Sequence, residues 1–180
     1  RVVRVHREMP DIEPPPFFAL SQGHDRRINR WQIAIYMAPG FNMTEVGFHP
    51  TDTDRVEGHL MMRPIHIITP ETDHTSHYIW AVARNFRLDD DDLDSGLWQA
   101  IDHTFKEDRE LLEIQDARLQ AEGMPKVPQL AAKIDSGPVA GRRLLDAMIR
   151  KEQEDPRYCA PPIPLADDDV VTMPFAVAAE

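Results

Sequence analysis

The fold of this chain is decided by a stretch that begins His66-Ile-Ile-Thr-Pro-Glu-Thr-Asp-His-Thr-Ser-His-Tyr-Ile-Trp-Ala-Val-Ala-Arg-Asn-Phe86 and continues to Gln120. The quoted residues contain two β-prone segments separated by Pro, Asp and Thr, which is typical of a strand pair joined at a hairpin. Five aspartates follow within residues 89–94, and a helical pattern begins at about Trp98. The stretch therefore predicts two strands followed by a long helix.

Apolar residues recur at three- and four-residue steps along the predicted helix, which is the spacing of a buried stripe. They are Trp98, Ile101, Phe105, Leu112 and Leu119. The same stripe carries Asp108 and Gln115. Because an ionised carboxylate loses its hydration when it is buried, Asp108 requires a metal, a cation or a set of donors. The partner could be an arginine such as Arg84, or the helix could rotate enough to expose Asp108.

Upstream of this stretch, apolar and polar residues alternate in several short segments separated by turn residues. The predicted strands are residues 1–6, 31–37, 41–48, 60–69 and 75–86. Residues 14–16 are prolines that we interpret as a rigid connection, and residues 21–30 have the polarity of a loop. Consecutive strands with short connections favour an antiparallel meander. With the long helix packed across it, the sheet gives an α+β domain.

Composition limits the kind of protein this can be. A chain of 180 residues with 42% hydrophobic content can bury one core, and its net charge of -11 argues against a nucleic-acid surface. No apolar run approaches the roughly 18 residues that span a bilayer. Because Cys159 is the sole cysteine, an intramolecular disulfide is impossible, and a reducing cytoplasm is compatible with the sequence.

Two other polar groups have possible metal-binding interpretations. His74 and His77 would point to opposite faces of a strand and have no third ligand nearby, so a metal site there is disfavoured. The aspartates of residues 89–94 lack the mid-loop glycine and terminal glutamate of an EF-hand, and we expect them to cap the following helix instead.

Four segments together resemble the C-terminal catalytic domain of Rieske non-haem iron oxygenases, in the branch of vanillate O-demethylase and phthalate dioxygenase-like oxygenase components. They are His66-Ile-Ile-Thr-Pro-Glu-Thr, Thr75-Ser-His-Tyr-Ile-Trp, Arg84-Asn-Phe and Phe105-Lys-Glu-Asp-Arg-Glu-Leu-Leu-Glu. These blocks occur in the order found in the family and at nearly its spacing. The resemblance covers most of residues 1–150.

The resemblance implies a helix-grip architecture, in which a curved sheet wraps a long helix and leaves a cavity for a planar aromatic guest. It also implies a mononuclear Fe(II) held by two histidines and a carboxylate, and Asp108 matches that carboxylate. The same resemblance places His66 and Trp98 in the substrate pocket. From pattern alone, His66 is interpreted as an ordinary core or surface residue of an apolar strand.

The resemblance further implies parts that this sequence does not supply. We expect residues 1–155 to form the C-terminal part of the catalytic domain and residues 156–180 to form a tail, and we expect the chain to be a piece of something longer because it lacks an initiator Met. The Cys-x-His and Cys-x-x-His pairs that hold the [2Fe-2S] cluster of the Rieske domain are absent. We expect the two iron-binding histidines upstream, with a homotrimer reduced by a ferredoxin or reductase and using O2.

Two functional hypotheses remain open at this point. The first is the catalytic part of an oxygenase that hydroxylates or O-demethylates an aromatic substrate, and the second is a metal-free helix-grip module that binds an apolar small molecule. An acidic residue followed by two histidines five residues apart, immediately upstream, would favour the first. The sequence does not identify the substrate.

Overall fold

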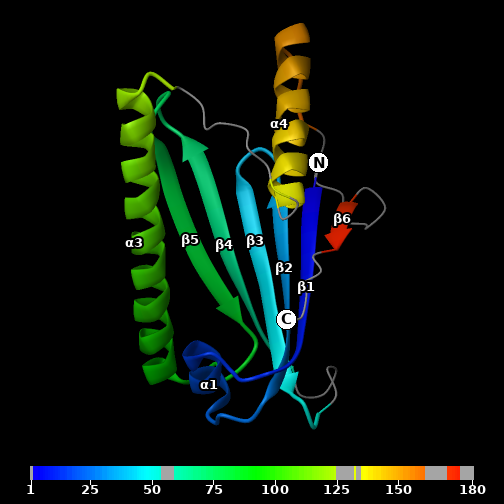
Figure 1. Ribbon diagram of the computed structural model, residues 1–180, viewed down its shortest axis with the longest axis vertical. Coiled ribbons are helices and arrows are strands. Elements are labelled where there is room, and N and C mark those ends of the chain that lie inside the picture. Colours follow the sequence, from blue (N-terminus) through cyan, green and yellow to red (C-terminus); the bar gives the residue numbers. More distant parts are fainter. Residues whose placement is uncertain (1, 54–58, 125–131, 133–134, 161–169, 175–180) are drawn as a thin grey trace.

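The computed structural model describes residues 2–53, 59–124, 132, 135–160 and 170–174. An antiparallel sheet forms its centre, and the first five strands pair with one another in chain order (Figure 1). These strands are β1 (Val2–Ile12), β2 (Ile28–Met37), β3 (Phe41–Pro50), β4 (Leu60–Pro70) and β5 (Ser76–Arg84). The predicted antiparallel meander is confirmed.

A sixth strand, β6 (Val170–Pro174), lies beside β1 and runs parallel to it, with Val2 opposite Val170. The sheet order is therefore β5-β4-β3-β2-β1-β6. The predicted tail of residues 156–180 thus contains β6, a strand that the sequence pattern did not indicate. Five residues are too few for a two-residue period to stand out within an acidic, proline-containing segment.

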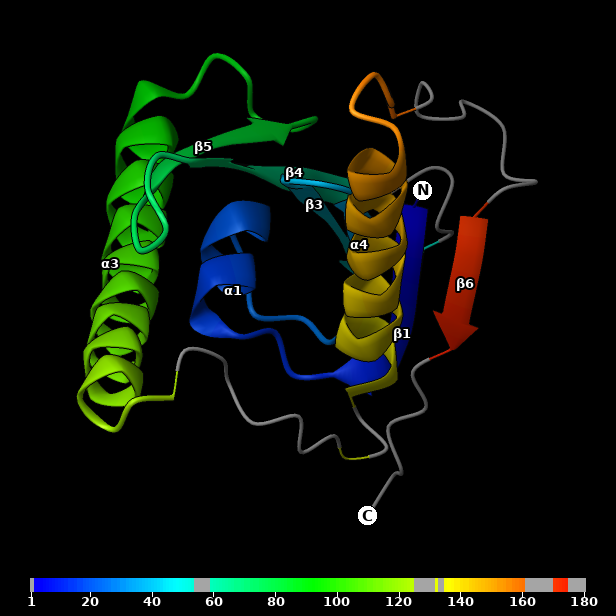
Figure 2. The ribbon, with the colours of Figure 1, turned by 90° about the horizontal axis from the view of Figure 1, so that it is seen from above.

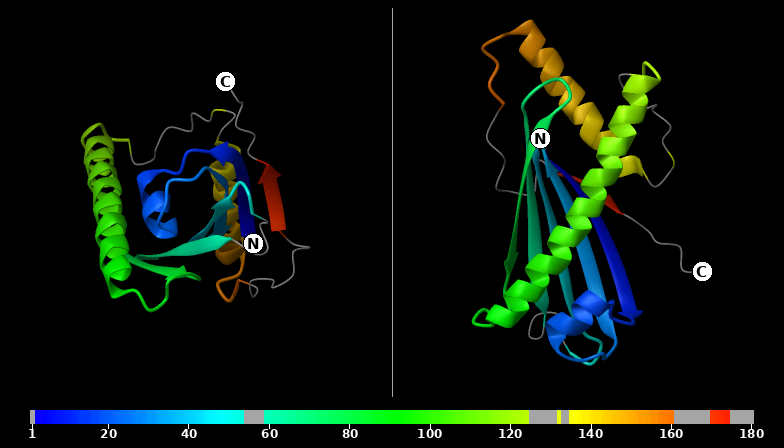
Figure 3. Two further views of the ribbon diagram at one scale, coloured as in Figure 1. Left: turned by 90° about the horizontal axis from the view of Figure 1, so that it is seen from below. Right: turned by 90° about the vertical axis from the view of Figure 1, so that its left-hand side faces the viewer.

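Within the described ranges, three helices accompany the sheet: α1 (Pro16–Gln22), α3 (Asp91–Ala121) and α4 (Ser136–Glu154). Seen from above, α3 and α4 lie toward opposite ends of the curved sheet, and α1 lies between them (Figure 2). From the side, α3 runs obliquely across the strands (Figure 3). Residues 14–16 thus lead into a helix, because proline is well suited to the first helical position.

All three helices pack on one face of the sheet. The strand registers place Tyr36, Asn42, His66 and Trp80 side by side on successive strands, so these side chains share a face. The indole of Trp80 contacts α3, and Tyr36 lies against α4. On the same face, Phe18 of α1 meets Phe48 edge to face with ring centroids 5.0 Å apart. The fold is the α+β helix-grip arrangement that the sequence predicted.

The aspartate run starts α3 earlier than the apolar spacing indicated. The Asp90 carboxylate accepts a hydrogen bond of 2.9 Å from the backbone N–H of Leu93, and Asp91, Asp92 and Asp94 occupy the first turn. Carboxylates are stabilised there by the helix dipole and by the unpaired N–H groups. The predicted capping role is confirmed, whereas the predicted start at about Trp98 is wrong because the first turns carry few apolar residues.

The apolar stripe of α3 is buried at its beginning and exposed further along. Leu93 and Leu97 are buried, and Ile101 and Phe105 are partly buried. Trp98 and Leu112 remain 58% and 62% exposed. The predicted burial along the whole stripe is therefore wrong for the part of the chain that the structure describes, since the sheet and α1 cover only the first half of α3.

The main hydrophobic core lies where α1, the start of α3 and one end of the sheet meet. Its fully or nearly buried members are Phe18, Ile28, Val46, Phe48, Met62, Phe86, Leu93 and Leu97. This core fixes the first two turns of α3 against β4 and β5. The side chains further along α3 and β5, Trp80 and Phe105 among them, are consequently positioned by this core.

Candidate active site

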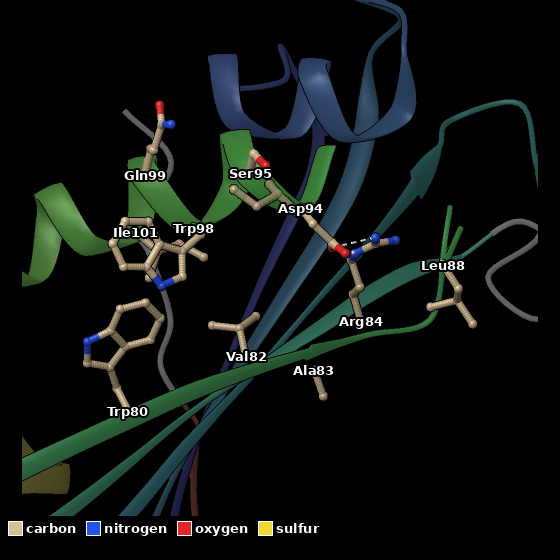
Figure 4. A pocket seen from close by; sticks show the side chains of 11 residues that line it. Trp80, Val82, Ala83, Arg84, Leu88, Asp94, Ser95, Trp98, Gln99 and Ile101 are labelled. Carbon is tan, nitrogen blue, oxygen red and sulfur yellow. Dashed lines mark hydrogen bonds and ion pairs between the residues drawn. The ribbon is translucent and has the colours of Figure 1, made fainter. Parts of the chain in front are cut away.

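A cavity of about 680 Å³ opens between β5 and the first turns of α3. Figure 4 shows Trp98 above Trp80 at one end, Arg84 paired with Asp94 at the other, and Val82 between them. The two indole rings have centroids 6.4 Å apart and an interplanar angle of 32°. Apolar side chains with a charged pair at one end form a surface suited to a planar organic molecule.

Arg84 closes one end of this cavity and is fully engaged by the protein. Its side chain is 8% exposed, and its Nε and Nη2 donate to Asp94 Oδ1, at 3.1 Å for Nε. Its Nη1 donates to the backbone carbonyls of Phe86 and Arg87. The guanidinium thus ties the end of β5 to the first turn of α3. It does not pair with Asp108, so the arginine partner considered from the sequence is wrong.

Four rings from α3, β4 and β5 extend the wall begun by Trp98. We call the set Trp98, Trp80, Phe105, His66 and Tyr78 the aromatic row. Phe105 meets Trp80 edge to face at 5.4 Å between ring centroids, and it lies 4.9 Å from the His66 ring. The row is continuous because each of its rings contacts the next across α3, β4 and β5.

His66 and Tyr78 form a hydrogen-bonded pair at the far end of the aromatic row. His66 Nδ1 lies 2.7 Å from the Tyr78 hydroxyl, and the two rings are parallel within 1°. Burial lowers the pKa of His66, an effect that the nearby negative charge of Asp108 partly offsets. Burial, assisted by Asp108, raises the pKa of Tyr78. His66 is therefore neutral and Tyr78 protonated near neutral pH.

Asp108 follows Phe105 by one helical turn and lies close enough to influence both members of this pair. Its side chain is nevertheless exposed, as is that of Leu112 on the next turn. The expectation that Asp108 is buried is wrong for the described part of the chain. Its assignment as an iron ligand stays a prediction.

The structure brings together some of the predicted site residues and separates others. Trp98 lines the 680 Å³ cavity, whereas His66 lies beyond Trp80 and Phe105 and does not line it. His74 and His77 are exposed at the β4–β5 hairpin. Within the described ranges, no group of three or more His, Cys, Asp or Glu side chains is placed to hold a metal ion. The residues that the structure describes thus do not complete an iron site by themselves.

Tyr78 and Trp80 are members of the aromatic row that the sequence reasoning did not single out. They alternate with Ile79 and Ala81 along β5, so both point to the helix-bearing face. The two-residue step from Tyr78 through Trp80 to Val82 was the available signal. It could not be used without the register that sets Trp80 opposite His66.

A second hollow of about 390 Å³ lies between α4 and strands β1–β3. Its lining is mainly apolar and includes Val3, Val5, Ala34 and Leu145. Neither His66 nor Asp108 lines this second hollow.

The helices of the described residues are all too short or too polar to span a bilayer.

Residues 1–151 match the profile of a family described as the vanillate O-demethylase oxygenase C-terminal domain. Among curated proteins, the chain is 36% identical over 131 residues to a putative toluene-4-sulfonate monooxygenase system iron-sulfur subunit of Comamonas testosteroni, covering 70% of this chain and 37% of that protein. It is 32% identical over 156 residues to a vanillate O-demethylase oxygenase subunit of Pseudomonas sp., covering 82% and 47% respectively.

Among solved structures, dicamba monooxygenase bound to 3,6-dichlorosalicylic acid superposes with a TM-score of 0.67 at 23% identity. The match covers 85% of this chain and 44% of that structure, and it demonstrates a shared fold. The chain spans less than half of the length of each of these relatives.

Proposed function

We infer the function from the family to which this chain belongs, the vanillate O-demethylase oxygenase C-terminal domains of Rieske-type oxygenases. We propose that residues 1–155 are the C-terminal part of a catalytic domain and that residues 156–180 are an appendage to it. The complete protein would act as the oxygenase component of a cytoplasmic system that hydroxylates or O-demethylates an aromatic substrate. It would use O2 and electrons from NAD(P)H delivered by a reductase or ferredoxin.

The observation that carries this proposal is the aromatic row with Asp108 at its end. Aromatic side chains offer flat apolar surface to an aromatic ring, and His66 adds a polar group beside them. Trp98 and Trp80 would contact the ring at the cavity, and His66, which lies beyond Trp80 and Phe105, would bind a polar substituent that extends past them. A carboxylate one turn beyond Phe105 would then lie near the bound substrate.

Asp108 would serve as the carboxylate ligand of a mononuclear Fe(II), which supplies the activation of dioxygen when two histidines complete its coordination. Of these ligands the chain would supply Asp108 alone, and both histidines and the [2Fe-2S] cluster would come from segments outside this chain. A homotrimer, in which the cluster of one subunit serves its neighbour, is part of the same proposal. It would need head-to-tail contacts that close into a ring.

Iron content and kinetics of the complete protein test the roles of individual residues. Asp108→Ala should abolish bound iron and turnover, whereas Asp116→Ala, the same change two turns further along α3, should preserve both. His66→Ala and Trp98→Ala should retain iron and raise KM. Iron at the wild-type level in Asp108→Ala would remove the ligand assignment.

Oxygen consumption distinguishes the oxygenase from a metal-free binding module. Substrates named for the relatives, namely vanillate, dicamba and toluene-4-sulfonate, supply the first panel. The complete protein with Fe(II), NADH and a cognate reductase should couple oxygen consumption to loss of at least one of them. The 180-residue chain alone should not. Binding of aromatics by the complete protein without any oxygen consumption would favour the binding module.

A further inference from the structure

We propose that Tyr78 is a positioning residue that fixes His66 in its Nε2–H form, so that the site selects aromatic substrates carrying a hydrogen-bond acceptor. The inference rests on the proposed function in assigning His66 to the substrate. The hydrogen bond between the Tyr78 hydroxyl and His66 Nδ1, at 2.7 Å, is the contact from which it starts. Tyr78 lies within one of the segments that carry the family resemblance, but no role was predicted for it from the sequence.

The strand geometry explains why these two side chains meet. The β4–β5 register sets His66 opposite Trp80 and Tyr78 opposite Ile68, so Tyr78 is the diagonal neighbour of His66 on the same face. Diagonal neighbours on a sheet lie roughly 7–8 Å apart, which aromatic side chains can bridge. Phe105 packs from α3 against both rings, at centroid distances of 4.9 Å and 6.3 Å. The pair is thereby held from two elements.

The chemistry of the two groups determines the direction of the hydrogen bond. A neutral imidazole has one nitrogen that donates and one that accepts, and the partner of either nitrogen selects the form. A phenol hydroxyl is a stronger acid than an imidazole N–H, and an imidazole nitrogen is a stronger base than a phenol oxygen. The Tyr78 O–H therefore donates to Nδ1, and the proton of His66 resides on Nε2.

The electrostatics of the pair agree with this direction. Burial lowers the pKa of His66, which keeps the ring neutral despite the opposing effect of Asp108. The pKa of Tyr78 is raised by burial and by Asp108, so its hydroxyl keeps the proton that it donates. Among the residues that the structure describes, Nε2 of His66 has no hydrogen-bonding partner. It is available to donate to a ligand.

A fixed donor gives the site a preference that a freely rotating histidine would lack. A carboxylate, sulfonate or phenolate oxygen on an aromatic ring can accept from Nε2–H, whereas a ring without such an acceptor gains nothing from it. The substrate class that this geometry favours is therefore an aromatic ring bearing an anionic oxygen. Without the Tyr78 hydroxyl, His66 could exchange its proton between nitrogens and rotate about its χ angles.

Nitrogen NMR of the complete protein, labelled with ¹⁵N-histidine, tests the tautomer directly. The His66 signal is assigned by its loss in His66→Gln. Wild-type His66 should show a protonated Nε2 and an unprotonated Nδ1, and Tyr78→Phe should shift both resonances toward an exchanging average. Tyr36→Phe is the matched control, because it deletes a hydroxyl that donates to the carbonyl of Pro39 instead. Wild-type His66 protonated on Nδ1 would overturn the proposal, whatever the protein catalyses.

Binding of two probes tests the consequence for specificity. In Tyr78→Phe, the Kd and KM for 3-methoxybenzoate should rise roughly five- to tenfold, as for one lost hydrogen bond, with kcat and iron content near wild type. Binding of methoxybenzene, which lacks the carboxylate, should be unchanged, and Tyr36→Phe should alter neither. Equal weakening for both probes would overturn the positioning role. Failure of the wild-type protein to bind either probe would count against the proposed function, and the NMR result would still decide the tautomer.

Discussion

Gly47→Ala should destabilise this protein far more than a typical glycine substitution in a strand. Gly47 lies in β3 beneath the indole of Trp31, which is 3% exposed. A methyl group at Gly47 would lie 1.7 Å from Cζ2 of Trp31 and 2.1 Å from Cε2. Because carbon atoms in contact are about 3.5–4.0 Å apart, the indole would have to retreat by roughly 2 Å.

The surroundings of Trp31 oppose such a retreat. Its ring centroid lies 6.4 Å from that of His49 and 6.0 Å from that of His59. Overpacking of this kind costs typically 1–3 kcal/mol, and the size of the overlap places Gly47→Ala near the upper end, at about 3 kcal/mol. For a protein of this size, that corresponds to a fall in Tm of roughly 6–12 °C.

Gly96→Ala supplies a matched control with the opposite sign. Gly96 lies within α3, and a methyl group added there would meet nothing within 4 Å. Since alanine is the better helix former, this variant should gain roughly 0.5–1 kcal/mol. Thermal and urea unfolding, followed by circular dichroism, measure both changes under the same conditions.

A double mutant tests whether the overlap itself is the cause. Trp31→Phe removes the Cζ2 and Cη2 atoms against which the Gly47 methyl would collide. Gly47→Ala combined with Trp31→Phe should therefore be less destabilised than the sum of the single changes, by roughly 1 kcal/mol or more. Additive effects, or a Gly47→Ala variant as stable as the wild type, would refute the packing argument.

Two further changes test the contacts that hold the start of α3. Arg84→Met should lower the free energy of unfolding by roughly 1–3 kcal/mol in a urea titration, because it leaves the backbone carbonyls of Phe86 and Arg87 without their donor. A loss below about 0.5 kcal/mol would contradict the role of Arg84 in tying β5 to α3. Asp90→Ala should lower Tm because it removes the oxygen that caps α3. Asp90→Asn keeps a capping oxygen and should lower Tm less. Equal losses of Tm in the two variants would contradict capping as the cause. The hydrogen bond from the Leu93 N–H, and after it the one from Arg87, hold the pKa of Asp90 below its usual value. The ionised Asp90 should therefore stabilise the folded protein fully above a pH of about 4, and this stabilisation should be lost as the pH falls through the lowered pKa. The Tm difference between wild type and Asp90→Asn should narrow over that acidic range, and a constant difference would contradict the linkage.

The apolar spacing of residues 98–119 revealed a helix because side chains three and four residues apart share a face whatever lies opposite. It could not reveal that Leu112 is exposed in the described chain, since burial depends on the elements that cover that face. For the same reason, the spacing missed the first two turns of α3. In these two turns Leu93 and Leu97 are the buried residues, and the Asp90 cap determines where the helix begins.

Local patterns in the sequence were enough to predict the antiparallel strands β1–β5 and the long helix after them, and the blocks around His66 and Asp108 carry the family resemblance. Each of these depends on alternation, spacing or local motif, which are properties of neighbouring residues. The tertiary structure alone decided that Tyr78 reaches His66, that Arg84 pairs with Asp94 and that β6 joins β1. These contacts depend on strand register and helix placement, because a shift of one residue in register would move Tyr78 to the opposite face of the sheet.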